Sequence, residues 1–136
     1  MLTQKYINQL SYRIVGCAIE VHKYLGPGLL ESVYEVCLID ELKSNGLKVF
    51  KQLMIPIKYK NKELGCSLFL DLLVEDLIIV ELKSVEVLIP VFKAQLLSYL
   101  KLTGKPKGLL INFNTENIAQ NLVPLVTEEF SRLPKE

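Results

Sequence analysis

The sequence predicts a mixed α/β protein whose central sheet is covered by helices on both faces. Two long segments with apolar residues at helical spacing come first, three strand-like segments follow, and a third helix precedes a last strand. Two of the strand-like segments are almost continuously apolar, which is typical of central strands buried on both faces. A strand–helix–strand crossover after a meander of strands implies a sheet with both parallel and antiparallel pairs.

Three helices are expected, and each is followed by a glycine where a C-terminal cap belongs, at Gly26, Gly46 and Gly104. Pro90 opens the third helix, since proline is well tolerated in the first helical turn. The helices cover about residues 4–24, 30–44 and 91–103.

Four strands are expected, and Pro56 in the first marks an edge strand or a bulge. The second and third strands meet at a turn that contains Glu75 and Asp76. The remaining segment, through Pro124, is predicted to be a short strand or helix. The four strands cover about residues 47–59, 64–74, 77–84 and 107–113.

The composition limits the class of protein. Its 136 residues fit one domain, which we take as residues 1–136. The net charge is +1, from 16 basic and 15 acidic residues, so only a local patch would attract nucleic acid. Because half of the residues are hydrophobic, we expect some apolar surface to be buried in a homodimer interface.

A cytoplasmic location is expected from three features. Cys17, Cys37 and Cys66 match no zinc-binding spacing, and as free thiols they suit a reducing compartment. Residues 1–9 are polar and lack the apolar stretch of a signal peptide. No apolar run reaches the length of a membrane-spanning helix, so we expect no membrane contact.

Three ionisable residues lie inside the most apolar strands: Asp71 in one, and Glu81 and Lys83 in the next. Such side chains are rarely buried unless they are paired or bind a metal ion. Because side chains alternate along a strand, Glu81 and Lys83 share one face. A three-residue turn, 75–77, places Asp71 opposite Glu81, whereas a two-residue turn places it opposite Val80.

Two adjacent carboxyl groups in a dry site repel each other, and a divalent cation that prefers oxygen ligands, Mg²⁺ or Mn²⁺, resolves the conflict. Lys83 then lies beside the metal, where it contacts a phosphate or orients the attacking water. The alternative is a buried ion pair, in which Lys83 neutralises one acid and the other acid reaches solvent. The spacing of the three residues leaves both interpretations open.

Other polar residues lie at helical spacing. Gln95 and Tyr99 share one face of the third helix, as the polar edge of an amphipathic helix or as groups that reach the site. Glu31 follows Gly28 and is either a carboxylate favoured by the helix dipole or a further acid at the metal. His22, the only histidine, caps carbonyl groups or takes part in catalysis.

Five lysines cluster around the first strand and its turn. They form either a solvated edge that discourages aggregation or a track for the phosphates of nucleic acid. These residues are Lys48, Lys51, Lys58, Lys60 and Lys62.

Five short motifs follow one another along the chain. They are GLLESVY at 28–34, DLLVED at 71–76, VELK at 80–83, AQLLSYLK at 94–101 and GLLINF at 108–113. In this order they resemble the GxxExxY protein family, a branch of the PD-(D/E)XK nuclease superfamily, over roughly residues 10–115. The resemblance implies a restriction-endonuclease-like αβββαβ core, with a mixed four-stranded sheet flanked by helices.

The resemblance also implies a Mg²⁺- or Mn²⁺-dependent nuclease that hydrolyses phosphodiester bonds in DNA or RNA. The metal would be held by Asp71, Glu81 and the backbone carbonyl of Leu82. Lys83 would position water or stabilise charge that develops on the phosphate. The catalytic residues implied are Glu31, Asp71, Glu81, Lys83 and Gln95, with Tyr34 and Tyr99 as accessory residues.

The sequence departs from the family pattern at two positions. Phe69 stands where members usually carry arginine, and Phe92 stands where they usually carry histidine. Phe69 shares strand parity with Asp71, so we expect both aromatic rings to pack together near the site. The loss of two polar groups favours the alternative of a nuclease-fold module that binds nucleic acid or protein with little or no turnover.

Overall fold

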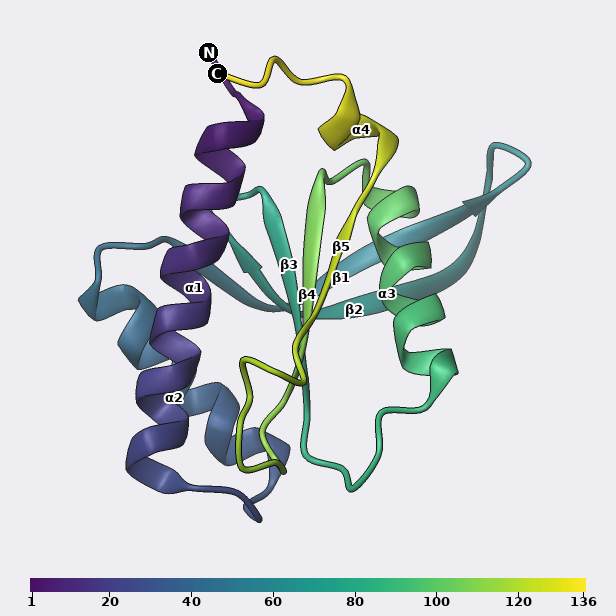
Figure 1. Cartoon of the computed structure of the whole chain (residues 1–136). Coiled ribbons are helices and arrows are strands. Elements are labelled where there is room, and N and C mark those ends of the chain that lie inside the picture. The colour runs from purple at the N-terminus through teal and green to yellow at the C-terminus, as the bar shows by residue number, and fades with distance from the viewer.

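The computed structural model describes residues 1–136 as a five-stranded sheet between two helical layers (Figure 1). The helices are α1 (Gln4–Leu25), α2 (Glu31–Ser44), α3 (Pro90–Thr103) and α4 (Glu128–Ser131). The strands are β1 (Val49–Tyr59), β2 (Lys62–Val74), β3 (Ile78–Lys83), β4 (Lys107–Asn112) and β5 (Val123–Val126). None of the helices combines the length and the apolar character needed to cross a membrane.

The strands lie in the order β1-β2-β3-β4-β5, and β3 and β4 are parallel while the other neighbours are antiparallel. The predicted mixed sheet flanked by helices is therefore confirmed, with α3 as the crossover. The predicted strand count of four is wrong, because β5 pairs with the outer edge of β4. Pro124 obscures this strand in the sequence, since proline lacks a donor and is tolerated only at a sheet edge.

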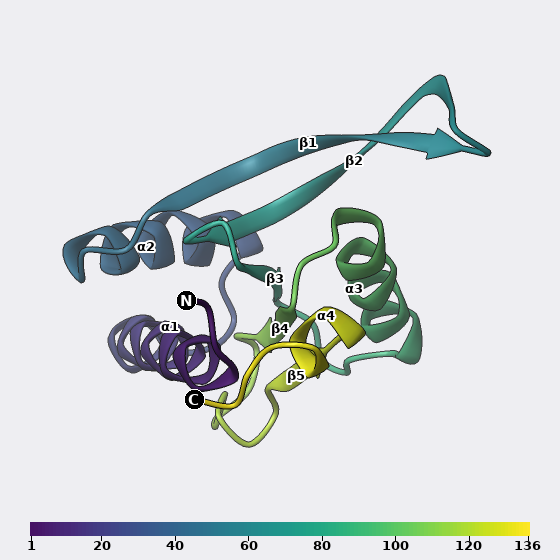
Figure 2. The same ribbon diagram turned by 90° about the horizontal axis from the view of Figure 1, so that it is seen from above.

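Each face of the sheet has its own apolar core. The helices α1 and α2 pack on one face, and α3 covers the other (Figure 2). At Gly108 in β4, an added Cβ atom would lie 3.0 Å from a δ-carbon of Leu96 and 3.1 Å from one of Leu100. The absence of a side chain there lets α3 pack directly on the strand. Burial on both faces explains why β3 and β4 are almost continuously apolar.

Strands β1 and β2 extend beyond the rest of the sheet as a two-stranded ribbon, residues 53–70, which we call the arm (Figure 2). The pairing of β1 with β2 is interrupted at Gln52 and Asp71, and Gln52 has a positive φ of 48°. On the two sides of this interruption, Leu70 and Leu73 both join the core under α3. A regular strand would place residues three apart on opposite faces, so the arm is rotated relative to the sheet.

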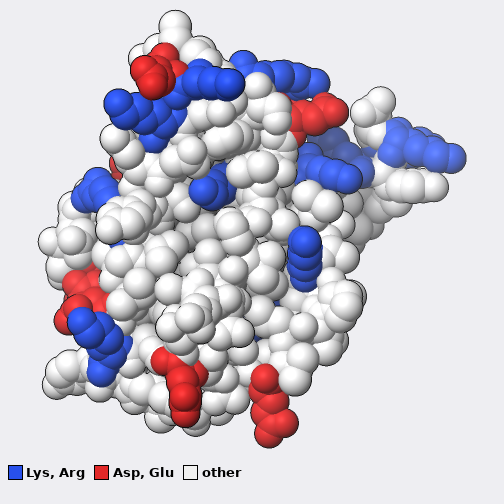
Figure 3. Space-filling view, in the orientation of Figure 1, with Lys and Arg blue, Asp and Glu red and all other residues white.

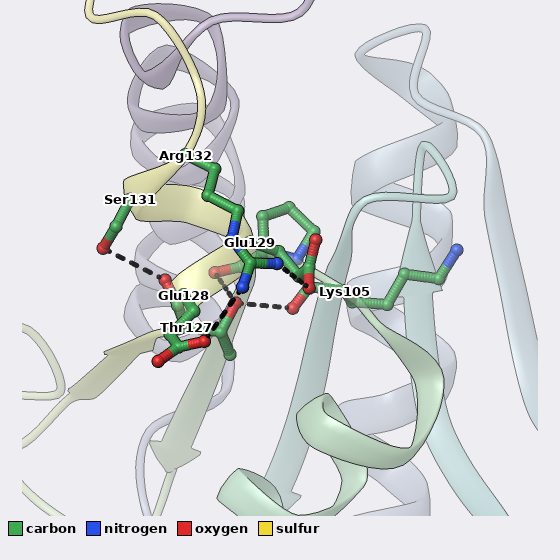
Figure 4. Close-up of polar contacts among 7 residues, drawn as sticks. Lys105, Thr127, Glu128, Glu129, Ser131 and Arg132 are labelled. Carbon is green, nitrogen blue, oxygen red and sulfur yellow. Dashed lines mark hydrogen bonds and ion pairs between the residues drawn. The ribbon is translucent and has the colours of Figure 1, made fainter.

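The C-terminal segment folds back along the edge of the sheet and ends beside the start of α1 (Figure 1). The hydroxyl of Thr127 donates to the carbonyl oxygens of Lys105 (3.0 Å) and Pro106 (3.2 Å). Arg132 pairs with Glu128 and Glu129 on α4 (Figure 4). These ion pairs are exposed and contribute little to stability, so the contacts of Thr127 with the main chain fix this end of β5.

Candidate functional site

The turn between β2 and β3 determines which residues of the two strands face each other. It contains three residues, 75–77, between the paired ends of the strands. Glu75 and Asp76 adopt positive φ values of 54° and 58°. Contacts from outside hold this conformation: the N–H of Lys48 donates to Oε2 of Glu75 (2.6 Å), and Lys105 pairs with Asp76 (2.9 Å). The turn therefore has the length that the predicted pairing of the two acids requires.

Where β2 and β3 separate, acidic side chains replace the hydrogen bonds of the ladder. The last paired residues are Leu72 and Val80. One step further, the N–H of Asp71 donates to Oε1 of Glu81 (3.3 Å), and the N–H of Leu82 donates to Oδ2 of Asp71 (3.0 Å). The two carboxyl groups therefore lie side by side at the point where the strands part. We call Asp71 and Glu81 the acid pair.

Burial dominates the electrostatics of the acid pair. The Glu81 residue is only 8% exposed. Its burial, the charge of Asp71 and a hydrogen bond between the two side chains raise the pKa of Glu81 to about 9, against the opposing charge of Lys83. At neutral pH Glu81 therefore holds a proton, and its neutral carboxyl group lies beside that of Asp71.

Lys83 lies close to the acid pair but forms no ion pair with it, since the ion pairs of the protein involve Lys105 and Arg132 alone. Its ammonium group lies 4.4 Å from the centre of the Phe92 ring, in the first turn of α3. The sequence alternative of a buried ion pair between Lys83 and one acid is therefore wrong. The aromatic face takes the place of the acid as the neighbour of the ammonium group.

The expected contact between Phe69 and Phe92 is also wrong. The ring contacts in the protein join Phe113 to His22 and to Tyr34. Phe69 is 54% exposed on the arm. The interruption of the β1–β2 pairing reverses the alternation of faces, so parity counted from Asp71 does not apply to Phe69.

The helix α3 places Tyr99 near the acid pair. Burial raises the pKa of Tyr99, and the charges of Glu81 and Asp71 raise it further, while a hydrogen bond from Gln95 opposes them. That bond runs from Nε2 of Gln95 to the Tyr99 hydroxyl (2.7 Å). Tyr99 is therefore a neutral phenol within electrostatic range of both acids. Gln95 is linked to the site by its hydrogen bond to the Tyr99 hydroxyl.

Tyr34 is fully buried and organises the loop between α1 and α2. Its hydroxyl donates to the carbonyl oxygen of Gly26 (2.6 Å) and accepts the N–H of Leu29 (3.1 Å). Its ring stacks on Phe113, with centroids 4.5 Å apart. The hydroxyl that the resemblance made an accessory group is therefore used by the loop that precedes Glu31.

Glu31 is exposed at the start of α2, beside the end of β3. Its Oε1 accepts the N–H of Ser84 (3.3 Å), and the Ser84 hydroxyl donates to the carbonyl oxygen of Leu29 (2.5 Å). No third acid, histidine or cysteine completes a metal-binding group with the acid pair. Glu31 is therefore placed next to the strand that carries Glu81, but not within the pair itself.

Two residues of this region, Ser84 and Asn112, were not singled out in the sequence. Asn112 is buried beside Lys83 in the parallel pairing of β3 with β4. Its Oδ1 accepts the N–H of Val85 (3.1 Å) and its Nδ2 donates to the Val85 carbonyl oxygen (2.8 Å). A polar residue inside an apolar strand is the signal that pointed to Asp71, and the same signal identifies Asn112. No comparable signal marks Ser84.

His22 lies outside this group. Its Nε2 is within hydrogen-bond distance of the Thr115 carbonyl oxygen (2.6 Å), in the loop after β4. The histidine thus joins α1 to that loop, and the carbonyl it contacts belongs to a segment other than its own helix. None of its contacts is with the acid pair.

The chemistry of the acid pair fits a divalent cation. Each carboxyl group accepts one backbone N–H, while Oδ1 of Asp71 and Oε2 of Glu81 accept none. Mg²⁺ is commonly bound by one or two carboxylates, with water in its remaining positions. The two carboxyl oxygens that accept no backbone N–H are thus a suitable donor set for such an ion.

Comparison with known protein families gives a match over most of the chain. A sequence model described as the PD-(D/E)XK nuclease superfamily matches residues 8–123. The matched segment includes the acid pair, β1 to β4, α2, α3 and all but the first four residues of α1. Comparisons with curated proteins and with solved structures give no significant match.

Proposed function

The chain belongs to the PD-(D/E)XK nuclease superfamily, and we propose from this premise that it is a divalent-metal-dependent nuclease acting on DNA or RNA. The observation that carries the proposal is the acid pair: Asp71 and Glu81 lie side by side, Glu81 buried and Asp71 partly buried, and each has one oxygen that accepts no backbone N–H. Uncompensated carboxyl groups are costly inside a protein, and a structural role does not require two of them.

Asp71, Glu81 and the backbone carbonyl of Leu82 would hold Mg²⁺ or Mn²⁺. When bound, the cation would polarise the phosphodiester group and lower the pKa of a coordinated water. Glu81 must first release its proton, since a metal ligand has to be deprotonated.

Three side chains around the acid pair would act on the substrate. The Lys83 ammonium carries a charge that no acid neutralises, so it is available to a phosphate oxygen. The Tyr99 phenol is neutral and would donate a hydrogen bond, with Gln95 fixing its orientation. Glu31, whose second oxygen accepts no backbone N–H, would orient water from the α2 side.

A second candidate is a nuclease-fold module that binds metal and nucleic acid with little or no turnover. The observation that favours it is the position of Lys83, whose ammonium lies on the Phe92 ring. A lysine held in this way would contribute less to stabilising charge on a phosphate. The cytoplasmic location, the homodimer and the GxxExxY branch stay predictions.

Calorimetric titration with Mn²⁺ tests both candidates, using the wild type, Asp71→Asn and the control Asp40→Asn, whose carboxyl group is exposed on α2. We expect Asp71→Asn to lose Mn²⁺ binding and Asp40→Asn to keep it. Cleavage of single- and double-stranded DNA and RNA is then measured with Mn²⁺ and with EDTA.

Metal binding with cleavage supports the nuclease, and metal binding without cleavage supports the binding module. Failure of the wild type to bind Mn²⁺ contradicts both. Urea unfolding of the metal-free proteins serves as the control for folding. Asp71→Asn should be at least as stable as the wild type, because it removes a charge from a partly buried site while the amide oxygen can still accept the N–H of Leu82.

A further inference from the structure

We propose that the arm, residues 53–70, is the surface that holds a nucleic acid duplex against the acid pair, and that Lys58, Lys60 and Lys62 at its tip contact the phosphates. The inference rests on the proposed function and assigns the part of the protein that the substrate backbone meets. Three features of the arm support it: the arm begins at the acid pair, its tip is positively charged, and its turn is tight.

The arm begins at the site. Strand β2 separates from β3 at Asp71, and from there it is paired with β1 alone, as far as Tyr59 and Lys62. The two strands leave the body of the molecule as a ribbon (Figure 2). From Leu53, paired with Leu70, to Tyr59, paired with Lys62, the arm is six residues long on β1, about 20 Å, while β2 bulges over the same stretch. That length is more than half of one turn of a nucleic acid duplex, about 34 Å.

The tip carries positive charge without acidic partners. Residues 58–63 contain three lysines and one glutamate, in a chain whose net charge is only +1. None of these lysines takes part in an ion pair, although Lys58 lies opposite Glu63 in the strand register. Tyr59 is 60% exposed beside them. Figure 3 shows basic side chains on the projecting arm at the right of the molecule.

Lys58 lies on the edge strand β1, but protection of that edge does not explain Lys60 and Lys62. The strand at risk is β1, whose outer edge is unpaired, and its central residues 53–57 are Leu-Met-Ile-Pro-Ile, without charge. In that stretch Pro56 interrupts the edge, since it offers no N–H. Lys60 and Lys62 lie on the turn and on β2, so they leave the exposed edge uncovered.

The turn at the tip retains a lysine in an unfavourable conformation. Lys60 and Asn61 have positive φ values of 50° and 65°, as in the tight two-residue turns that favour asparagine and glycine. A lysine in this region costs conformational energy. The tight turn keeps the ribbon narrow, and a two-stranded ribbon fits the major groove of a duplex. The base of the arm is held by Leu53, Ile55 and Ile57, which pack on the core under α3.

Duplex binding is measured by fluorescence anisotropy in EDTA, with a labelled duplex of about 30 base pairs, enough for two to three helical turns. The arm variant is Lys58→Gln/Lys60→Gln/Lys62→Gln. The matched control removes three exposed lysines of the helices, Lys5→Gln/Lys23→Gln/Lys43→Gln, and changes the net charge equally.

We expect the arm variant to bind at least about tenfold more weakly at low salt, and the control to change by less than about threefold. The slope of log K against log salt should fall by roughly 2 to 3 in the arm variant, near 0.9 for each lost phosphate contact. The variant Lys58→Arg/Lys60→Arg/Lys62→Arg should retain wild-type affinity, which distinguishes lost charge from a disrupted arm.

Equal losses in the two glutamine variants, or wild-type binding by the arm variant, would overturn the inference. A larger loss on the matched single strand than on the duplex would overturn the choice of duplex. Because the assay contains no metal, it is independent of cleavage. Arm-dependent binding by a wild type that cleaves nothing would refute the proposed nuclease and leave the arm as a binding surface.

Discussion

The ammonium group of Lys83 lies on the face of the Phe92 ring, 4.4 Å from its centre, and not on the carboxyl groups beside it. A lysine next to two acids is expected to pair with one of them, and the pairing would occupy the oxygens that a cation needs. The ring offers an alternative neighbour, because its negative face attracts a cation. We infer that Phe92 keeps Lys83 and the acid pair apart in the metal-free protein.

Phe92→Leu should therefore weaken Mn²⁺ binding. Without the ring, Lys83 turns toward the acid pair and competes with the metal. A cation–π contact is worth about 0.5 to 2 kcal/mol, so the dissociation constant should rise roughly two- to thirtyfold. Calorimetry measures this change, and Phe92→Tyr, which keeps an aromatic face, should stay near the wild-type value. Equal affinities in the Leu variant and the wild type would contradict the role given to Phe92.

The stability of the metal-free protein should depend on the proton of Glu81. Its pKa is raised from 4.5 to about 9 by folding, chiefly through burial. Between these values the folded state holds a proton that the unfolded state lacks. The free energy of unfolding should therefore fall as the pH rises from about 4.5 to about 9, by at most about 1.4 kcal/mol per pH unit.

Glu81→Gln removes this dependence, because the amide stays neutral at every pH. The difference in unfolding free energy between the variant and the wild type should grow in favour of the variant from pH 5 to about pH 8.5. Urea unfolding in EDTA at three pH values in this range measures it. Parallel pH profiles for the two proteins would show that Glu81 is not protonated at neutral pH.

Tyr34→Phe should loosen the loop before α2 and leave the core intact. The change removes the hydroxyl that joins the Gly26 carbonyl to the Leu29 N–H, while the ring keeps its stacking on Phe113. We expect a loss of about 1 to 2 kcal/mol in unfolding free energy. Faster amide hydrogen exchange at Leu29 should accompany it. The control Tyr12→Phe, 82% exposed, should change neither quantity.

Two glycine substitutions should change the free energy of unfolding in opposite directions. In Gly108→Ala the new methyl group meets fully buried δ-carbons of Leu96 and Leu100 at 3.0 and 3.1 Å, so we expect a loss of about 1 to 3 kcal/mol. In Gly16→Ala nothing lies within 4 Å, and alanine in the middle of α1 should add about 0.5 to 1 kcal/mol. Urea unfolding compares the two, and stabilisation by Gly108→Ala would contradict the close packing of α3 on β4.

Local patterns in the sequence were sufficient for most elements. The three long helices have their predicted ends to within one residue, and the four predicted strands to within two. Helix ends depend on neighbouring residues such as Gly26 and Gly104, whose positive φ values of 72° and 68° fit their expected position after each helix. The fifth strand forms because it pairs with β4, and Pro124 and its neighbours have little strand pattern of their own.

The side of the sheet on which Phe69 lies could not be found by counting residues. Parity holds only while a strand stays regular, and the pairing of β1 with β2 is interrupted opposite Asp71. The contact of Lys83 with Phe92 and that of Glu31 with Ser84 could not be predicted either, because each joins two different segments of the chain. Such partners are chosen by how separate elements pack, and the spacing of residues within one element does not encode that choice.

The sequence alone determined that Glu81 and Lys83 share one face of their strand, with Asp71 on the strand before it, because strand alternation is a local property. The three-residue turn that sets Asp71 opposite Glu81 is held by Lys48 and Lys105, which folding brings to it. Only the tertiary structure decided what surrounds the two acids: the strands separate at Asp71, Tyr99 and Phe92 approach from α3, and Ser84 holds Glu31 to one side. The physical reason is the distance along the chain over which each effect acts. Backbone geometry acts between adjacent residues, whereas burial and charge act between groups that only folding brings together.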